Sequence, residues 1–301
     1  MARPLLLDVD TGVDDAMAIA LASRLDDHDL IALTSVAGNV PLDVATRNTL
    51  RVADWLGLDV PVHPGMSAPL VRPLHTAHEH HGDDGLGGWD APEARSTASD
   101  VFAPEAIVRL AREYQGDITF VFVGPLTNLA VALNLEPRVA QWVRRLVIMG
   151  GAFFNPGNVT PHAEFNIYVD PEAASQVANT MSATWVGLDA THQTGVTRSA
   201  WDALDSASDV GAILAREVTR RTLVELERPQ SHLHDPLAVA VAESDEVVTT
   251  VSGRVVVDTG EHRRGETRVA TVAANDTVSL VARDLDRGKF DTQFARVIGQ
   301  R

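Results

Sequence analysis

Two kinds of apolar pattern alternate along the chain up to about residue 226. Short runs rich in β-branched residues are typical of strands buried on both faces, and longer runs with an apolar residue every three to four positions are typical of helices. The expected strands are 5–8, 30–36, 118–123, 146–149 and 184–188. The expected helices are 14–25, 42–56, 103–114, 171–179 and 210–226. This alternation predicts an α/β fold with an open, mostly parallel sheet flanked by helices.

The pattern changes after about Val247. Residues 254–258 and 267–272 alternate in the manner of strands, and residues 289–298 form a closing helical pattern. We therefore expect a C-terminal β-hairpin added to the sheet and then a last helix, all within a single α/β domain that spans residues 1–301. Ligands of open α/β sheets lie beyond the carboxyl ends of the strands, so polar residues at those positions are the first candidates for function.

The composition narrows the chemistry. The 301 residues include no cysteine, which excludes disulfides, thiolate nucleophiles and thiolate zinc sites and fits a cytoplasmic protein. No apolar run approaches the roughly 20 residues of a membrane-spanning helix, so we expect no membrane partner. The net charge of −16 repels nucleic acid on average, and it leaves a small neutral substrate or a bound cation as the better partner.

The segment that follows the first expected strand carries four carboxylates within eight residues, Asp8, Asp10, Asp14 and Asp15. Such a group is unfavourable unless protons or a cation relieve the repulsion. Asp14 and Asp15 alone would be explained as acidic residues at a helix N-terminus. That explanation does not cover Asp8 and Asp10, which lie at the end of a buried strand.

Two known acidic motifs do not fit this segment. The haloacid dehalogenase phosphatases place Thr or Val two residues after the second aspartate, where this chain has Gly12. An EF-hand loop ends in glutamate at its twelfth position, which here is Ile19 or Leu21. Ligation by several carboxylate oxygens remains, and it suits a hard cation such as Ca²⁺ or Mg²⁺.

Four other polar segments are candidates, and each also has a purely structural interpretation. Residues 123–128 form a Gly-Pro turn at a strand end, which can direct a backbone carbonyl toward the cleft, although most Gly-Pro turns are only structural. Asn158 and the run 164–166 suit a sugar, but they also suit a polar loop around a core phenylalanine. Asp235 either serves a site or only caps a helix. The histidine-rich run 78–87 lacks the helical spacing of a zinc motif, which favours a mobile active-site loop.

In their order along the chain, these segments resemble the motifs of the inosine-uridine nucleoside hydrolase family, and the resemblance runs through nearly the whole chain. Residues 8–16 match the family signature, with Thr11 where proline is usual. The other matching motifs are Gly38-Asn39, Thr46-Arg47-Asn48, His81-Gly82, residues 124–128, residues 163–166, residues 170–173 and His234-Asp235-Pro236. The open α/β sheet of the family agrees with the pattern described above.

The resemblance implies a calcium-dependent enzyme that hydrolyses the N-glycosidic bond of ribonucleosides to ribose and free base. It implies that Ca²⁺ is held by the side chains of Asp10, Asp15 and Asp235 and by the carbonyl of Val123. Asp10 is then the expected catalytic base that takes a proton from water, with Asp14 as the alternative. The small-molecule substrate would be a ribonucleoside.

The resemblance also implies how the substrate is held. It assigns five polar side chains to the ribose, namely Asp14, Asn39, Asn158, Glu164 and Asn166. It places three residues around the base, namely His81, Phe165 and His232. His234 matches the family's proton donor to the leaving base, and a homodimer or homotetramer is the expected assembly.

The chain departs from the family in one stretch. Residues 222–233, which carry tyrosines near the base in purine-accepting relatives, contain none here, and the chain has only Tyr114 and Tyr168. The preference for purine or pyrimidine and the identity of the proton donor therefore stay open, with His232 as a further candidate donor. Two other functions on the same fold also stay open, namely hydrolysis of a modified or non-nucleoside riboside and binding of a nucleoside without catalysis.

Overall fold

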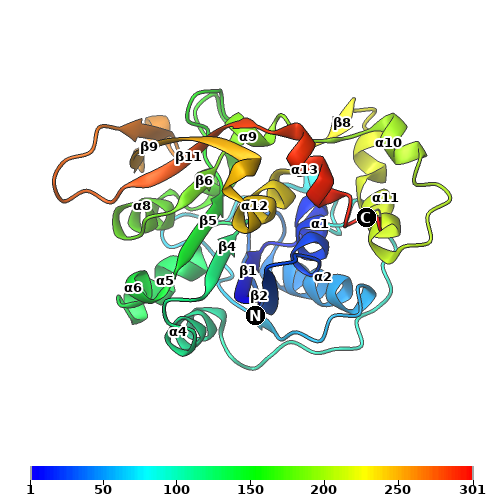
Figure 1. Cartoon of the computed structure of the whole chain (residues 1–301), viewed down its shortest axis with the longest axis horizontal. Coiled ribbons are helices and arrows are strands. Elements are labelled where there is room, and N and C mark those ends of the chain that lie inside the picture. The colour runs from blue at the N-terminus through cyan, green and yellow to red at the C-terminus, as the bar shows by residue number, and fades with distance from the viewer. Residues whose placement is uncertain (1, 300–301) are drawn as a thin grey trace.

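The central feature of the structure, a computed structural model that describes residues 2–299, is a nine-stranded sheet (Figure 1). The strands lie in the order β10-β9-β11-β6-β5-β4-β1-β2-β3. Their bounds are β1 Arg3–Val9, β2 His28–Ser35, β3 Val62–Pro64, β4 Thr119–Phe122, β5 Arg145–Met149, β6 Thr184–Val186, β9 Val248–Val257, β10 Thr267–Ala270 and β11 Ser279–Leu285. The pairings from β11 through β6 to β3 are parallel, so the carboxyl ends of these strands meet along one edge.

The side chains of the central strands alternate between two apolar cores. In β1, Leu5 and Leu7 pack into one core and Leu6 into the other. In β4, Val121 packs into the first of these cores and Phe122 into the second. Because both faces of these strands are covered, both sets of side chains are apolar, and this is why the strands appear in the sequence as continuous apolar runs.

Helices cover both faces of the sheet, which confirms the expected fold class. The helices that contribute to the first core include α1 Val13–Ala22, α2 Leu42–Trp55, α11 Val210–Arg220, α12 His234–Glu243 and α13 Arg287–Phe294. Those of the second core include α4 Ala103–Glu113, α5 Thr127–Leu135, α6 Val139–Trp142 and α8 Pro171–Thr180.

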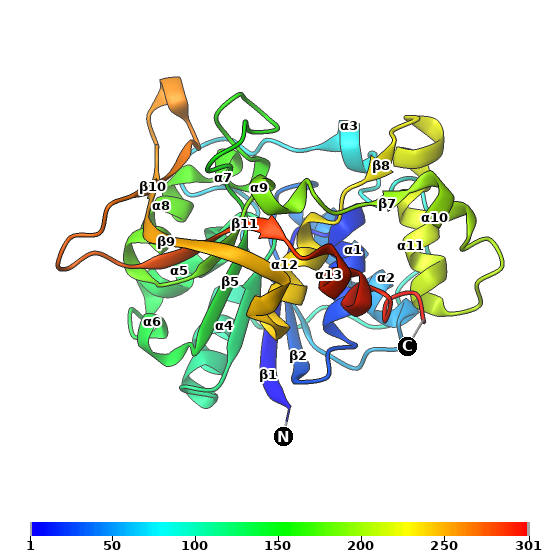
Figure 2. The same ribbon diagram turned by 45° about the horizontal axis from the view of Figure 1, so that its top comes forward.

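Several short elements complete the fold. The short helices α3 His78–His81, α7 Phe165–Val169 and α9 Leu188–Thr191 lie in the upper part of the view in Figure 2, and every residue of α9 is buried. The others are α10 Arg198–Asp202, the antiparallel pair β7 Val196–Thr197 and β8 Gln230–Ser231, and 3₁₀ turns at Asp245–Val247 and Glu261–Arg263. The run 78–87, expected to be a loop, therefore contains one helical turn.

The C-terminal hairpin and the last helix are confirmed, with one addition. β9 and β10 pair antiparallel, but a third strand, β11, lies between β9 and β6 and joins the hairpin to the sheet. The apolar pattern does not predict β11, because exposed charged side chains such as Arg283 and Asp284 interrupt it. The last helix covers residues 287–294 rather than 289–298.

Two expected helices end differently. The helix that follows β1 ends at Ala22 rather than at residue 25. The helix expected over 210–226 is α-helical to Arg220 and continues as a π-helical turn from Arg221 to Glu225. Glu227, just beyond this turn, has a φ of 49°, a left-handed conformation that stops any further helix.

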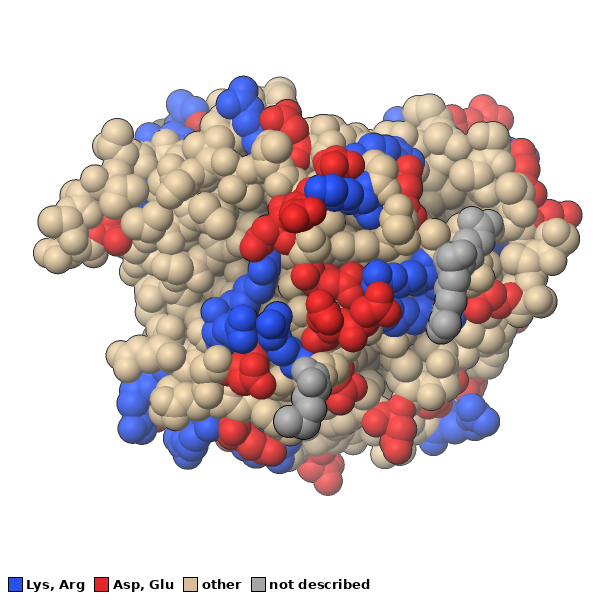
Figure 3. Space-filling view, viewed as in Figure 1, with Lys and Arg blue, Asp and Glu red and all other residues tan. Residues whose placement is uncertain are grey.

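Charges of both signs lie on the surface. On the face shown in Figure 3, acidic and basic side chains gather next to one another around the centre. The projection at the left, where the loop between β10 and β11 lies, is largely uncharged. Among residues 2–299, no helix is both long enough and apolar enough to cross a membrane.

Candidate active site

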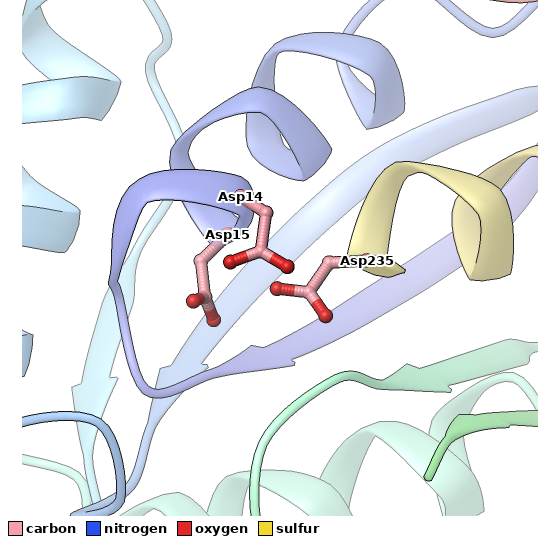
Figure 4. Close-up of side chains that lie close together, drawn as sticks. All are labelled: Asp14, Asp15 and Asp235. Carbon is pink, nitrogen blue, oxygen red and sulfur yellow. The ribbon is translucent and has the colours of Figure 1, made fainter. Parts of the chain in front are cut away.

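Carboxylates from two helices that are distant in sequence meet beyond the carboxyl end of β1. Asp14 and Asp15 lie in the first turn of α1, Asp235 lies in the first turn of α12, and their carboxylates point toward one another in Figure 4. One carboxylate oxygen from each of the three lies within 4.8 Å of the other two. Asp235 does not cap α12, because the residue at that position is Leu233. Its carboxylate is therefore available to the acidic cluster with Asp14 and Asp15.

Asp10 lies next to this cluster with one oxygen unpaired. The backbone N–H of Asn39 donates to Asp10 Oδ2 at 2.7 Å, whereas Oδ1 is buried with no hydrogen-bond partner among the described residues. A Cβ on Gly38 would lie 2.1 Å from Oδ2, and one on Gly124 would lie 2.9 Å from Oδ1. The absence of side chains at these two glycines is what lets the Asp10 carboxylate fit between the loops after β2 and β4.

Asp15 has a structural role as well as a place in the cluster. Its Oδ1 accepts from the N–H of Asp10 at 3.0 Å, and its Oδ2 accepts from the N–H of Gly12 at 2.8 Å and from Asn39 Nδ2 at 3.1 Å. The Gly12 contact caps the N-terminus of α1, as an acidic residue there is expected to do. The Asn39 contact brings this predicted ribose residue between Asp10 and Asp15.

The electrostatics of the cluster favour protons or a cation. Burial raises the pKa of Asp10 well above its usual range, and the neighbouring Asp15 raises it further. Burial and then Asp15 raise the pKa of Asp14 to about 7. Burial, followed by repulsion from Asp14, Asp15 and Asp10, raises the pKa of Asp235. Four buried carboxylates that repel one another, one of them with an unpaired oxygen, fit a hard divalent cation.

Asp8, the fourth acidic residue of the first motif, belongs to a separate network. Its Oδ2 accepts from the Thr34 hydroxyl at 2.6 Å and from Asn128 Nδ2 at 2.7 Å. Asn128 Nδ2 also donates to the carbonyl of Ser35 at 3.0 Å. Asp8 therefore ties the ends of β1 and β2 to the turn after β4, and this network supports the loops that carry the cluster.

The residues after β4 and β5 form a second wall of the site. Asn166 Nδ2 donates to the carbonyl of Val123 at 2.6 Å, so the predicted ribose residue and the predicted carbonyl ligand are in contact. Glu164 accepts from the N–H groups of Gly151, Asn166 and Ile167 at 3.1, 2.9 and 3.2 Å. Glu164 is thus the N-cap of α7, and its carboxylate also fixes the turn after β5.

Two other predicted contact residues are less closely held. Asn158 is exposed, on the loop between β5 and α7, and its N–H donates to the carbonyl of Ala163 at 3.1 Å. The half-buried ring of Phe165 has its centre 6.2 Å from that of His75. The structure therefore brings Asp10, Asp14, Asp15, Asn39 and Asp235 together, whereas Asn158 is exposed on its loop.

Three separate segments contribute histidines near these residues. The N–H of Val13 donates to His81 Nδ1 at 3.0 Å, and burial lowers the pKa of His81 to about 3. The ring is therefore neutral at pH 7 with its proton on Nε2. Burial and the neighbouring His232 and His192 lower the pKa of His234. The ring centres of His192, His232 and His234 lie 5.1 to 5.7 Å apart.

This arrangement of side chains can be compared with known proteins. The profile of the family described as inosine-uridine preferring nucleoside hydrolase matches residues 5–292. The chain belongs to this family. Among curated relatives, the pyrimidine-specific ribonucleoside hydrolases RihA of Citrobacter koseri and of Escherichia coli O1:K1 are each 37% identical to this nucleoside hydrolase, over 96% of both chains.

Solved structures of nucleoside hydrolases have the same fold as this enzyme. A plant nucleoside hydrolase, PpNRh1, superposes with a TM-score of 0.93 at 31% identity and covers 99% of both chains. The purine-preferring ribonucleoside hydrolase of Gardnerella vaginalis superposes with a TM-score of 0.90 at 32% identity, covering 99% of this chain and 98% of its own. The likeness in structure therefore extends over the whole nucleoside hydrolase chain.

Sequence reasoning missed the polar residues after β6. Asp189 accepts from the N–H groups of Phe153, Phe154 and Asn155 at 2.8 to 2.9 Å, and Thr191 Oγ1 lies 2.7 Å from His234 Nδ1. Both residues belong to α9, which begins directly after β6 in this nucleoside hydrolase. The rule that selected the other segments, polar residues beyond the carboxyl end of a parallel strand, also applies to residues 187–192.

Proposed function

We propose that this nucleoside hydrolase releases the free base from ribonucleosides with the help of a calcium ion held by Asp10, Asp15, Asp235 and the Val123 carbonyl. The observation that carries the proposal is the buried carboxylate cluster beside an unpaired Asp10 Oδ1. Asp14, which lies in the cluster, is assigned to the ribose together with Asn39. When bound, Ca²⁺ would keep the carboxylates ionised, hold hydroxyl oxygens and lower the pKa of a coordinated water.

The roles of the chain's own residues follow from their surroundings. Among the described residues, Asp10 Oδ1 has no hydrogen-bond partner, so it is free to accept the proton of the water whose oxygen attacks C1′. As the C1′–N bond breaks, the ribose gains positive charge, which nearby carboxylates such as Asp14 stabilise. The leaving nitrogen takes up a proton, and the proposed donor is the protonated ring of His234, which becomes neutral imidazole. His81, Phe165 and His232 are assigned to the base, and Asn158, Glu164 and Asn166 to the ribose side.

For the base, we propose a pyrimidine. The RihA relatives at 37% identity are named pyrimidine-specific, which supports this choice over the purine preference named for the Gardnerella vaginalis enzyme at 32% identity. The lack of Tyr, Phe and Trp in residues 222–233 supports it too, because a large bicyclic base gains more from aromatic stacking than a small ring does.

The test of the proposed function is a panel of ribosides assayed by release of free ribose, with added calcium and with a chelator. Uridine and cytidine are expected to be hydrolysed faster than inosine and adenosine, and the chelator is expected to stop turnover. Release of ribose only from non-nucleoside ribosides would contradict the proposal. Binding of nucleosides without any release of ribose would contradict it as well.

Addition of calcium is expected to raise the melting temperature, and to raise it more at pH 8 than at pH 5. The raised pKa values of the cluster mean that the metal-free folded state binds protons more tightly than the unfolded chain, whose carboxylates titrate near pH about 4. Stability of the metal-free protein therefore falls as the pH rises from about 4 through the raised values, and a cation that replaces these protons binds better at higher pH. Differential scanning fluorimetry measures the shift.

The control for this measurement is potassium at equal ionic strength, which should leave the melting temperature nearly unchanged. Asp235→Asn should reduce the calcium shift, because it removes one charge from the cluster. An equal calcium shift at both pH values, or an undiminished shift in Asp235→Asn, would argue against a calcium site at these carboxylates.

2′-Deoxyuridine is expected to be a poor substrate, with kcat/KM at least about 10²-fold below that of uridine. A contact to the 2-hydroxyl that strengthens in the transition state contributes several kcal/mol, and each 1.36 kcal/mol is about a factor of ten. Steady-state assays on the two substrates measure the ratio. 5′-Deoxyuridine, which keeps both secondary hydroxyls, serves as the matched control and should lose far less; similar losses for both deoxy compounds would contradict the proposed diol contact.

The remaining parts of the proposal concern organisation. We propose that the chain acts as a single domain, supported by a sheet that joins strands from residue 3 to residue 285. We also propose that the protein forms a homodimer or homotetramer. We place it in the cytoplasm, because a protein without cysteine has no disulfide that the reducing environment there could break. Light scattering after size-exclusion chromatography tests the assembly.

A further inference from the structure

We propose that Thr191 is a positioning residue, whose hydroxyl selects the orientation of the His234 ring. Thr191 is fully buried at the end of α9, and its Oγ1 lies 2.7 Å from His234 Nδ1. A hydrogen bond at one ring nitrogen determines which nitrogen is left for other partners. With Nδ1 held by Thr191, Nε2 is the nitrogen left for a leaving base. The inference rests on the proposed role of His234 as proton donor.

The helix that carries Thr191 is fixed at its other end. Asp189, two residues earlier, accepts three backbone N–H groups from residues 153–155 at 2.8 to 2.9 Å. The N–H of Thr191 donates to the carbonyl of Gly187 at 3.1 Å. α9 is therefore attached to the loop after β5, which leads toward Asn158, and the Thr191 hydroxyl is presented from a rigid support.

The segment that carries His234 is held by the same part of the chain. Thr194 Oγ1 donates to the carbonyl of Thr191 at 2.6 Å and accepts from the N–H of Leu233 at 3.0 Å. His232 Nδ1 donates to the carbonyl of Thr194 at 3.0 Å. Residues 232–234 are thus attached to residues 191–194 at three successive positions. The contact from Thr191 is the one of these that reaches the His234 ring.

Ring packing alone does not select the orientation. The ring centre of His234 lies 5.3 Å from that of His232 and 5.7 Å from that of His192. These neighbours limit how the imidazole tilts, but a ring turned by 180° about χ2 has nearly the same shape and packs almost equally well. The hydroxyl of Thr191 distinguishes the two orientations, since only one of them places Nδ1 against it.

The experiment compares two substrates in four variants. Uridine needs a proton on its leaving base, whereas p-nitrophenyl riboside releases p-nitrophenolate without one. Thr191→Val, which keeps the shape and removes the hydroxyl, should lower kcat on uridine about tenfold, within the range available from proton donation, and change p-nitrophenyl riboside by less than about twofold. Thr191→Ser should stay within about twofold of the wild-type kcat on both substrates. His234→Ala shows the full effect of losing the donor.

Thr119→Val is the matched control. Thr119 is also a buried threonine next to a buried imidazole, with its Oγ1 3.2 Å from His28 Nε2, but it lies at the first residue of β4, away from the carboxyl ends. This variant should leave kcat on both substrates unchanged. ¹⁵N NMR of the histidine rings should show the change at His234 in Thr191→Val and not in Thr119→Val. If Thr191→Val does not fold, Thr191→Ala takes its place.

The outcomes separate this inference from the proposed function. Equal losses on both substrates in Thr191→Val, or no loss on uridine while His234→Ala still discriminates between the substrates, would overturn the role of Thr191 and leave that of His234 intact. If His234→Ala itself did not discriminate, the proposed donor would be wrong, and the inference would fail with it. Discrimination in both variants, with rescue by serine, supports it.

Discussion

Asp10→Asn is expected to lower kcat on uridine by about 10²–10⁴-fold, the range typical of a lost general base. The substitution keeps the shape of the side chain between Gly38 and Gly124, where a Cβ on either glycine would already clash with the carboxylate. It removes the ability of the unpaired oxygen to accept a proton. The fold and part of the nucleoside binding should survive, so steady-state kinetics, a melting curve and equilibrium binding of uridine are the measurements.

Asp209→Asn provides the control for a changed aspartate elsewhere. Asp209 caps α11 and pairs with Arg24 at 3.0 Å, so its substitution should cost stability and leave kcat unchanged. If Asp10→Asn retained a kcat close to that of the wild type, Asp10 would not be the base. Asp14, which lies in the same cluster with a pKa raised to about 7, would then be tested in its place.

His234→Ala is expected to slow hydrolysis of uridine by about 10²–10⁴-fold and hydrolysis of p-nitrophenyl riboside much less. A pyrimidine anion is a poor leaving group and gains from protonation, whereas p-nitrophenolate leaves unaided at neutral pH. The proposed base Asp10 would act on both substrates, so a difference between them would report on the leaving group alone. Parallel assays of kcat on the two substrates measure the difference.

Other results would reassign His234. Equal losses on both substrates would mean that the imidazole only positions the adjacent Asp235 or shapes the pocket. No loss on either would place the donor elsewhere, and His81 and His232 would be tested next. The neutral His81 ring carries its proton on Nε2 while Nδ1 is occupied by Val13, so it has an N–H that can donate a hydrogen bond to the leaving base.

The sheet could be predicted because its strands are buried on both faces. The apolar runs of β1, β2, β4, β5 and β6 are continuous, and the helices between them have clear periodicity. β11 could not be predicted in this way, because exposed Leu280, Arg283 and Asp284 interrupt its buried residues without regular alternation, so the run is neither continuously apolar nor alternating. The π-helical turn at residues 221–225 could not be predicted either, since its apolar spacing is close to that of the α-helix it continues.

The site could be predicted in part, for a related reason. Asp10, Asn39 and Val123 follow strand ends, so the rule for parallel sheets selects them. The nearness of Asp235 to Asp14 and Asp15 depends on how α12 packs against α1, and no local pattern in the sequence contains that information. The role of Thr191 could not be predicted either, because a single threonine near a strand end has no distinctive spacing. Its partner, His234, lies 43 positions later in the chain.

The carboxylates that meet in Figure 4 come from α1 and α12, whose acidic residues are about 220 positions apart in the chain. A ribosome adds about 5–20 residues per second, so about 10 to 45 s pass between the synthesis of Asp15 and that of Asp235. During that interval the nascent polypeptide already contains Asp10 but lacks the part of the site that α12 supplies. With Asp235 as the proposed calcium ligand, a chain released before α12 is made would lack a complete metal site, and catalytic competence would arise only late in translation.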